Sequence, residues 1–180
     1  MAQFLILKST NDILQSQLDF YINFIESLAN NVYFFDLNSI SLEEAINKNT
    51  SPLVYSFVIV LGHGNDVMFS DNSNVEYTWL ELATCINNSD NFDENSTLIL
   101  KACDGGNKEV ANTIFRNCSR IKYIFGANGI QENFDLFFNS ILFLYYIFWK
   151  EKDSIKATEL VNKATDFDMV CFNRDGGSLY

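Results

Sequence analysis

VIVLGHG, at residues 58–64, is the stretch that decides the fold, and LILKACDGG, at residues 98–106, has a similar pattern of residues. Each begins with an apolar run that does not alternate with polar residues, as in a strand covered on both faces of a parallel sheet. Each then passes into a glycine-rich turn with a reactive side chain, His63 in the first and Cys103 in the second. Working outward from these two strands, we expect an α/β protein with a central, mostly parallel sheet.

Apolar segments of strand length alternate with amphipathic segments of helix length along the chain, as in parallel sheets with crossover helices. Six strands are predicted, at residues 3–8, 32–37, 55–61, 97–102, 122–125 and 167–172. Helices are predicted at residues 12–29, 77–87 and 108–117, after a capping Ser41, and from 134 to about 164 with a break near Asp153. The polar stretch at residues 65–74 is predicted to be a loop or a small hairpin.

The composition indicates a folded chain with an acidic surface. The 180 residues are 48% hydrophobic and 15% aromatic, which is enough for one domain, residues 1–180, with a sizeable core. The net charge of −11 would repel nucleic acid and anionic membranes, so neither is expected as a partner. The most apolar stretch, residues 141–149, is far shorter than the roughly 20 residues needed to cross a bilayer. We expect it to belong to a buried helix.

The cysteine and histidine content argues against a metal site. The chain has four cysteines (Cys85, Cys103, Cys118 and Cys171), no CxxC pair and a single histidine, so a zinc site of ordinary ligand spacing cannot be assembled. Glycine motifs that hold phosphates are also absent, and no cofactor is expected. The start of the sequence lacks the basic residues and cleavage site of a signal peptide, so free thiols in the cytoplasm are predicted. All the cysteines except Cys103 are expected to be buried and without a role.

His63 and Cys103 each follow directly after a predicted strand. In open α/β sheets, ligands bind beyond the carboxyl ends of the strands, where loops converge. If strands 55–61 and 97–102 are neighbours, an imidazole and a thiol meet in one cleft although they are 40 positions apart in the sequence. The glycines beside both residues permit the close approach of a substrate backbone.

A hydrophobic strand that ends in His-Gly, followed by another that ends in Ala-Cys and small residues, resembles the caspase-like cysteine peptidases. Within this superfamily, LKACDGG at residues 100–106, then a helix and YIFGA at residues 123–127, is most similar to the CHAT-domain proteases. The similar region, residues 55–148, is roughly half of the chain. The resemblance implies a three-layer α/β/α sandwich with about six strands.

The resemblance also implies a His-Cys dyad that hydrolyses peptide bonds in a protein or peptide substrate. Cys103 is the expected nucleophile, and His63 is expected to protonate the leaving amine and then to activate water. The backbone N–H groups of Gly64 and Cys103 are expected to form the oxyanion hole. This chemistry needs no metal or organic cofactor.

Three further residues are predicted to contact the substrate. Lys101 should project to the same side of its strand as Cys103, because side chains alternate along a strand. In the family, this position lines the pocket for the residue that precedes the scissile bond, and a lysine there would favour Asp or Glu. Asp104 and Asn128 are expected near the same cleft. The simpler interpretation of Lys101, an exposed lysine at a strand end, stays open.

Two other functions remain open from the sequence. One is a catalytically inactive caspase-like module that serves as an interaction or adaptor domain, and the other is a flavodoxin-like binder of a small ligand. The aromatic residues between positions 134 and 149 are expected to be mainly core, but their spread around the helix leaves room for a homodimer or a partner surface. The resemblance to CHAT proteases also implies a regulatory protein partner or an activating event.

Overall fold

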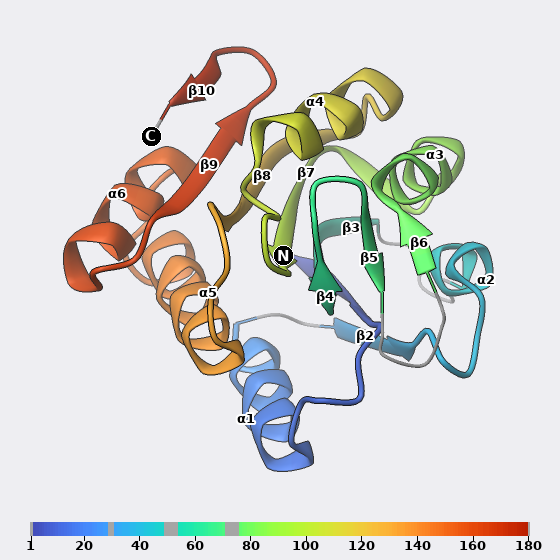
Figure 1. The fold of residues 1–180 in the computed structure, drawn as a ribbon, viewed down its shortest axis with the longest axis horizontal. Helices are drawn as coiled ribbons and strands as arrows, with labels where there is room; N and C mark the ends of the chain where they lie inside the picture. Colours follow the sequence, from blue (N-terminus) through green and yellow to red (C-terminus); the bar gives the residue numbers. More distant parts are fainter. Residues whose placement is uncertain (1, 29–30, 49–53, 71–75, 180) are drawn as a thin grey trace.

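A sheet of seven strands runs through the molecule in the order β10-β9-β8-β7-β3-β1-β2 (Figure 1). Five strands are parallel: β1 (Gln3–Lys8), β2 (Asn31–Asp36), β3 (Tyr55–Leu61), β7 (Phe92–Lys101) and β8 (Ile121–Ala127). The last two, β9 (Met169–Asn173) and β10 (Gly177–Leu179), are antiparallel. This computed structural model describes residues 2–28, 31–48, 54–70 and 76–179.

Helices cover both faces of the sheet, so the predicted three-layer α/β/α sandwich is confirmed (Figure 1). One face is covered by α1 (Gln15–Glu26), α5 (Asn133–Phe148) and α6 (Ser154–Ala164). The other face is covered by α2 (Leu42–Asn47), α3 (Trp79–Asn88) and α4 (Lys108–Asn117). Among the described residues, no helix has the length and apolar character to cross a membrane.

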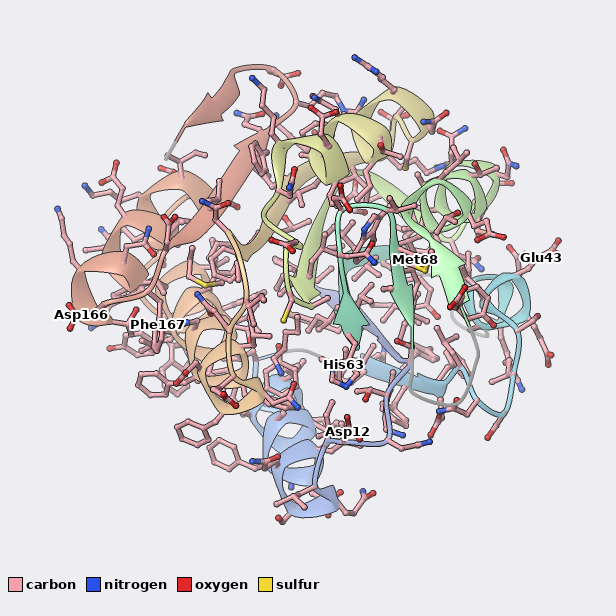
Figure 2. The ribbon with its side chains drawn as sticks, viewed as in Figure 1. Asp12, Glu43, His63, Met68, Asp166 and Phe167 are labelled. Carbon is pink, nitrogen blue, oxygen red and sulfur yellow. The ribbon has the colours of Figure 1, made fainter. Side chains whose placement is uncertain are left out.

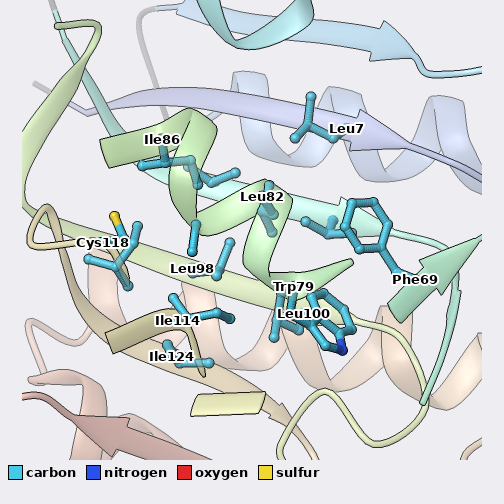
Figure 3. Packing of buried hydrophobic residues seen from close by; sticks show 14 of the residues in the cluster. Leu7, Phe69, Trp79, Leu82, Ile86, Leu98, Leu100, Ile114, Cys118 and Ile124 are labelled. Atoms are coloured by element: carbon cyan, nitrogen blue, oxygen red, sulfur yellow. The ribbon is translucent and has the colours of Figure 1, made fainter. Parts of the chain in front are cut away.

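The central strands are buried on both faces, as their unbroken apolar runs predict. In β7, Leu98 and Leu100 pack against the layer of α3 and α4, where Leu82 and Trp79 of α3 meet them (Figure 3). Ile99, between them in the sequence, packs into the cluster on the opposite face. The alternation of strand side chains therefore divides one apolar run between two cores.

Capping side chains fix where several helices begin. Ser41 accepts a hydrogen bond from the Glu44 N–H and starts α2, as its spacing predicts. The single long helix predicted from residue 134 ends at Phe148, and α6 begins after Asp153, whose carboxylate accepts from the Lys156 N–H. The break predicted near Asp153 is therefore confirmed, because this side chain caps a new helix.

Other boundaries differ from the prediction. The helix predicted from Asp12 begins three residues later, at Gln15, and Asp12 lies in the connection that precedes it. The small hairpin predicted as one possibility after His63 is present, because β4 (His63–Gly64) pairs with β5 (Met68–Ser70) in antiparallel fashion. A third strand, β6 (Glu76–Thr78), pairs with β5 and extends the hairpin to a second sheet. Residues 71–74 of that predicted loop lie outside the described residues. The strand β10 was not predicted, since it is only three residues long.

Candidate active site

The strands that carry His63 and Cys103 are hydrogen-bonded neighbours. In the parallel pair β3 and β7, Leu61 lies opposite Lys101. His63 and Cys103 each lie two residues beyond this pair. The Gly62 N–H also donates to the Lys101 carbonyl over 3.2 Å, which continues the pairing past the end of β3. The two strand ends thus lie side by side, as the sequence predicts for a shared cleft.

Gly64 permits the close approach of the histidine-bearing segment to the cysteine-bearing segment. A Cβ atom at Gly64 would lie 2.8 Å from the Ala102 Cβ and 3.1 Å from the Cys103 carbonyl oxygen, closer than a side chain tolerates. The same segment forms β4 and pairs with β5, which fixes the backbone at His63. A residue with a side chain at position 64 would therefore separate the histidine-bearing segment from the cysteine-bearing segment.

The imidazole of His63 is held by a carboxylate, that of Asp12. His63 Nε2 lies 2.7 Å from Asp12 Oδ2, and the two side chains lie next to each other in Figure 2. Both are partly open to solvent, with 39% and 45% of their side chains exposed. An ionised carboxylate only accepts hydrogen bonds, so Nε2 is the donor, and in the neutral imidazole Nδ1 then keeps its lone pair. This arrangement leaves Nδ1 available as a base.

Asp12 was not identified from the sequence as the partner of His63. The structure gives the role of ring partner to Asp12. The available signal was positional. Asp12 follows β1, and β1 is the neighbour of β3 in the sheet, so its connection emerges beside that of His63.

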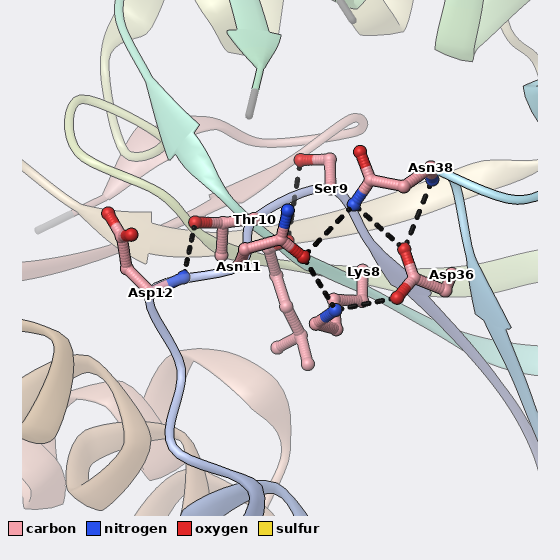
Figure 4. Close-up of polar contacts among 8 residues, drawn as sticks. Lys8, Ser9, Thr10, Asn11, Asp12, Asp36 and Asn38 are labelled. Atoms are coloured by element: carbon pink, nitrogen blue, oxygen red, sulfur yellow. Dashed lines mark hydrogen bonds and ion pairs between the residues drawn. The ribbon is translucent and has the colours of Figure 1, made fainter. Parts of the chain in front are cut away.

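A polar network holds the connection that carries Asp12 (Figure 4). Lys8 Nζ forms an ion pair with Asp36 Oδ2 at 2.6 Å and also reaches Asn11 Oδ1 at 3.5 Å. Asn38 Nδ2 donates to Asp36 Oδ1 and Asn11 Oδ1. Burial acts to raise the pKa of Asp36, but the hydrogen bonds from Lys8 and from the Asn38 N–H outweigh it and hold the pKa below its usual range. The ends of β1 and β2 are thereby tied together just before Asp12.

Cys103 is half-buried at the beginning of a tight turn. Its Sγ lies 3.8 Å from the Gln131 carbonyl oxygen, in the segment that precedes α5. The next residue, Asp104, has φ of 56°, a left-handed conformation that is uncommon outside glycine, and its N–H donates to the Gly129 carbonyl at 3.0 Å. Among the described residues, the Cys103 N–H donates no backbone hydrogen bond and the thiol makes none to His63.

The other three cysteines lie in less reactive surroundings. Burial raises the pKa of the Cys118 thiol and raises that of Cys171 to about 12. Burial, together with the nearby carboxylates of Glu43 and Glu81, raises the pKa of Cys85. Since a thiolate is the nucleophilic form, these shifts disfavour reaction at the three sites. All four thiols are free.

Lys101 is buried rather than exposed at the strand end. Only 4% of the residue is accessible, and its Nζ lies over the ring of Phe137 and 5.5 Å from the ring centroid of Tyr21. Burial lowers the pKa of Lys101 well below its usual range. In the described part of the chain, no carboxylate forms an ion pair with it. The Nζ amine is thus covered by aromatic rings.

Lys101 and Cys103 approach the same structural layer, as strand alternation predicts. Lys101 meets Phe137 of α5, and the Cys103 thiol meets Gln131 immediately before α5. Asn128 is engaged elsewhere, because its Nδ2 donates to Asp168 Oδ2 at 2.8 Å and its N–H donates to the Asp168 carbonyl. A role for Lys101, Asp104 or Asn128 in contacting a substrate stays a prediction.

Metal ligands do not gather in the described ranges. No group of three or more His, Cys, Asp or Glu side chains is placed there to hold a metal ion.

The comparison with family models gives one match. Residues 31–121, which include β3, His63, β7 and Cys103, match a model described as a domain of unknown function, DUF8616. No curated protein matches the chain.

Proposed function

The chain belongs to the DUF8616 family, whose description states no activity, and we propose from the geometry of its site that it is a caspase-like cysteine endopeptidase. The observation that carries the proposal is the meeting of two strand ends. One end presents an imidazole held by a carboxylate, and the other presents a half-buried thiol in a turn of small residues. These groups are the ones that thiol-based acyl transfer requires.

The proposed reaction begins with transfer of the Cys103 thiol proton to His63 Nδ1. The thiolate attacks the carbonyl carbon of the scissile peptide, and the carbonyl π electrons move to oxygen. When the tetrahedral intermediate collapses, the C–N bond breaks and the imidazolium gives its proton to the leaving amine. Water, deprotonated by His63, then attacks the thioester and releases the carboxylic acid and the free thiol.

Positioning supplies much of the proposed catalysis. Asp12 fixes the ring orientation and tautomer of His63 and stabilises the imidazolium that forms in both steps. The Cys103 N–H, which makes no backbone hydrogen bond in the described structure, is available to the developing oxyanion. Gly64 brings its own backbone beside Cys103 and is the proposed second donor. In a free enzyme the nucleophile and base are often farther apart than in the complex with substrate.

The proposed preference is for an acidic residue before the scissile bond. It is supported by Lys101, a buried amine that forms no ion pair among the described residues. A substrate carboxylate would provide the missing counter-ion, but it would have to displace the Phe137 ring from Nζ. Asp104 and Asn128 are the proposed walls of this subsite.

We place this activity in the cytoplasm. The four free thiols support this proposal, because oxidising compartments favour disulfides. The proposed substrate is a protein or peptide, with no cofactor. Because Lys101 is covered by Phe137, a regulatory partner that moves α5 is proposed as the activating event.

The adaptor function has one observation in its favour. The Cys103 thiol contacts the Gln131 carbonyl and makes no hydrogen bond to His63 in the described structure. A module that only binds partners needs no contact between the two. Reactivity of the thiol separates these two functions.

The test is covalent labelling followed by turnover. The protein is treated with a peptidyl chloromethyl ketone, and the labelled cysteine is located by mass spectrometry. A peptidase is expected to be labelled at Cys103 and to lose both labelling and peptide hydrolysis in Cys103→Ala. Cys85→Ala is the matched control, because Cys85 is the other partly exposed thiol. Equal labelling of Cys85 and Cys103 without hydrolysis would favour the adaptor.

A further inference from the structure

An apolar groove lies between α1 and α5. It is lined by Gln17, Phe20, Phe134, Phe137, Phe138 and Ile141 and has a volume of about 90 Å³. Phe20, Phe134 and Phe138 are 63%, 65% and 44% exposed. Ligand pockets for drug-sized molecules occupy about 300–1,000 Å³, so this groove has room for one side chain.

The groove begins at the edge of the molecule that carries the dyad. Helix α1 starts three residues after Asp12, the partner of His63, and α5 starts two residues after Gln131, the contact of Cys103. Figure 1 shows that α1 and α5 are neighbours on the same side of the sheet. Groove residues from the first turns of both helices therefore follow closely on the segments that contact His63 and Cys103.

A chain of contacts connects the floor of the groove to the nucleophile. Phe137 lines the groove, and the same ring lies against Lys101 Nζ. Lys101 is the last residue of β7 and lies two residues before Cys103. The floor of the groove therefore connects to the cysteine-bearing segment through the buried side chains of Phe137 and Lys101.

We propose that this groove is a substrate subsite, which binds an apolar or aromatic side chain near the scissile bond. The inference rests on the proposed peptidase function and adds a substrate class to it. Three exposed aromatic rings around a space of this size match a Leu, Met or Phe side chain, which would bury its surface and theirs.

The charges around the groove favour a substrate over a second copy of the chain. Asp12 lies three residues before α1, Glu132 is the N-cap of α5, and Asp135 lies in the first turn of α5. A second copy would bring a further net charge of −11 to a molecule of the same charge and would be repelled. A peptide with one apolar residue carries no such penalty.

The experiment measures kcat/KM on two sets of peptides that cover each position near the scissile bond. One set has Leu or Phe at the varied position, and the other has Ala or Ser. For the parent protein, one position is expected to show a preference of about 10-fold or more for Leu or Phe, the range that one apolar contact supports in a pocket. The variants Phe138→Ala and Phe20→Ala are expected to remove most of this preference.

Leu80→Ala is the matched control. Leu80 is an exposed apolar residue of α3, a helix that covers the other face of the sheet, and its loss is expected to leave the preference intact. Labelling of Cys103 by iodoacetamide is measured in every variant and is expected to stay the same. Reduced labelling would indicate damage at the dyad, whereas unchanged labelling with a lost preference would indicate loss of the subsite alone.

The possible failures are distinguishable. If the parent hydrolyses peptides without an apolar preference, or if the groove variants retain the preference, the proposed subsite is wrong. The proposed peptidase function is not contradicted by either result. If no peptide is hydrolysed and Cys103 is no more reactive than Cys85, the proposed function fails. If sedimentation shows a dimer that Phe138→Ala dissociates, the groove is a self-association surface and the subsite is overturned.

Discussion

His63 Nε2 and Asp12 Oδ2 lie 2.7 Å apart although 51 positions separate the two residues in the sequence. The contact exists because β1 and β3 are neighbours, so the connection after β1 emerges beside the end of β3. In the neutral imidazole, the carboxylate favours the proton on Nε2 and leaves the lone pair on Nδ1. In the proposed peptidase, the imidazole is thereby oriented as a base before any substrate arrives.

Asp12→Asn is expected to lower kcat by about 100-fold or more with little change in KM. An amide in place of the carboxylate permits the wrong tautomer and no longer stabilises the imidazolium. Steady-state kinetics on a peptide substrate measure the effect. Asp19→Asn, an exposed change on α1, is the control, and equal losses in both variants would contradict the role of Asp12.

Gly64→Ala is expected to lower activity strongly and stability moderately, by about 1–3 kcal/mol. The added methyl group would lie 2.8 Å from the Ala102 Cβ and push the histidine segment from the cysteine segment. Urea denaturation and peptide turnover measure the two effects. Gly129→Ala has no neighbour within 4 Å of the new atom, so it tests backbone strain at a positive φ without the clash. Full activity of Gly64→Ala would show that the close contact is unnecessary.

Lys101→Met is expected to stabilise the fold at neutral pH and to remove any preference for acidic substrates. Burial lowers the pKa of Lys101, so the unfolded chain binds more protons than the folded chain between the lowered pKa and the usual value near 10.4. Stability of the parent therefore rises with pH across this window. The difference in free energy of unfolding between the methionine variant and the parent should shrink as the pH approaches about 10. Urea denaturation from pH 7 to pH 10 measures this difference, and a difference that does not change with pH would contradict the buried-lysine explanation.

Arg174→Ala is expected to lower the free energy of unfolding by about 3 kcal/mol, because hydrogen bonds to charged groups contribute about 1.5–3 kcal/mol each. Its guanidinium donates to the carbonyls of Phe115, Cys118 and Ile121 and joins the end of α4 to the start of β8. Arg174→Lys keeps the charge but not the planar set of donors, so most of the loss should remain. Thermal unfolding compares the variants. A lysine variant as stable as the parent would show that charge alone is sufficient.

The sequence predicted the central part of the fold well, because its signals are local. Unbroken apolar runs identified β3 and β7 as central strands, and the two are neighbours, so the ends that precede His63 and Cys103 lie side by side. The three short strands after His63 and the strand β10 gave no comparable signal, since two or three residues show no periodicity.

The missing parts of the site depend on contacts that are distant in the sequence. The partnership of Asp12 with His63 requires the order of strands β1 and β3, which no local pattern reveals. The cover over Lys101 comes from Phe137, 36 positions later, through the packing of α5 on the sheet. Alternation alone placed Lys101 on the side of Cys103 but could not determine whether its charge would be open to solvent.

The outermost parallel strand, β2, also helps to position His63. Its end is joined to the end of β1 by the network of Lys8, Asp36, Asn38 and Asn11. The end of β2 secures the end of β1, the connection after β1 secures the imidazole, and the imidazole lies beside the strand that bears the thiol. The ends of four neighbouring strands, in the order β2, β1, β3 and β7, thus position one another. A protein with the same His-Gly and Ala-Cys motifs but another strand order would lack these contacts, so the two motifs alone do not define the site.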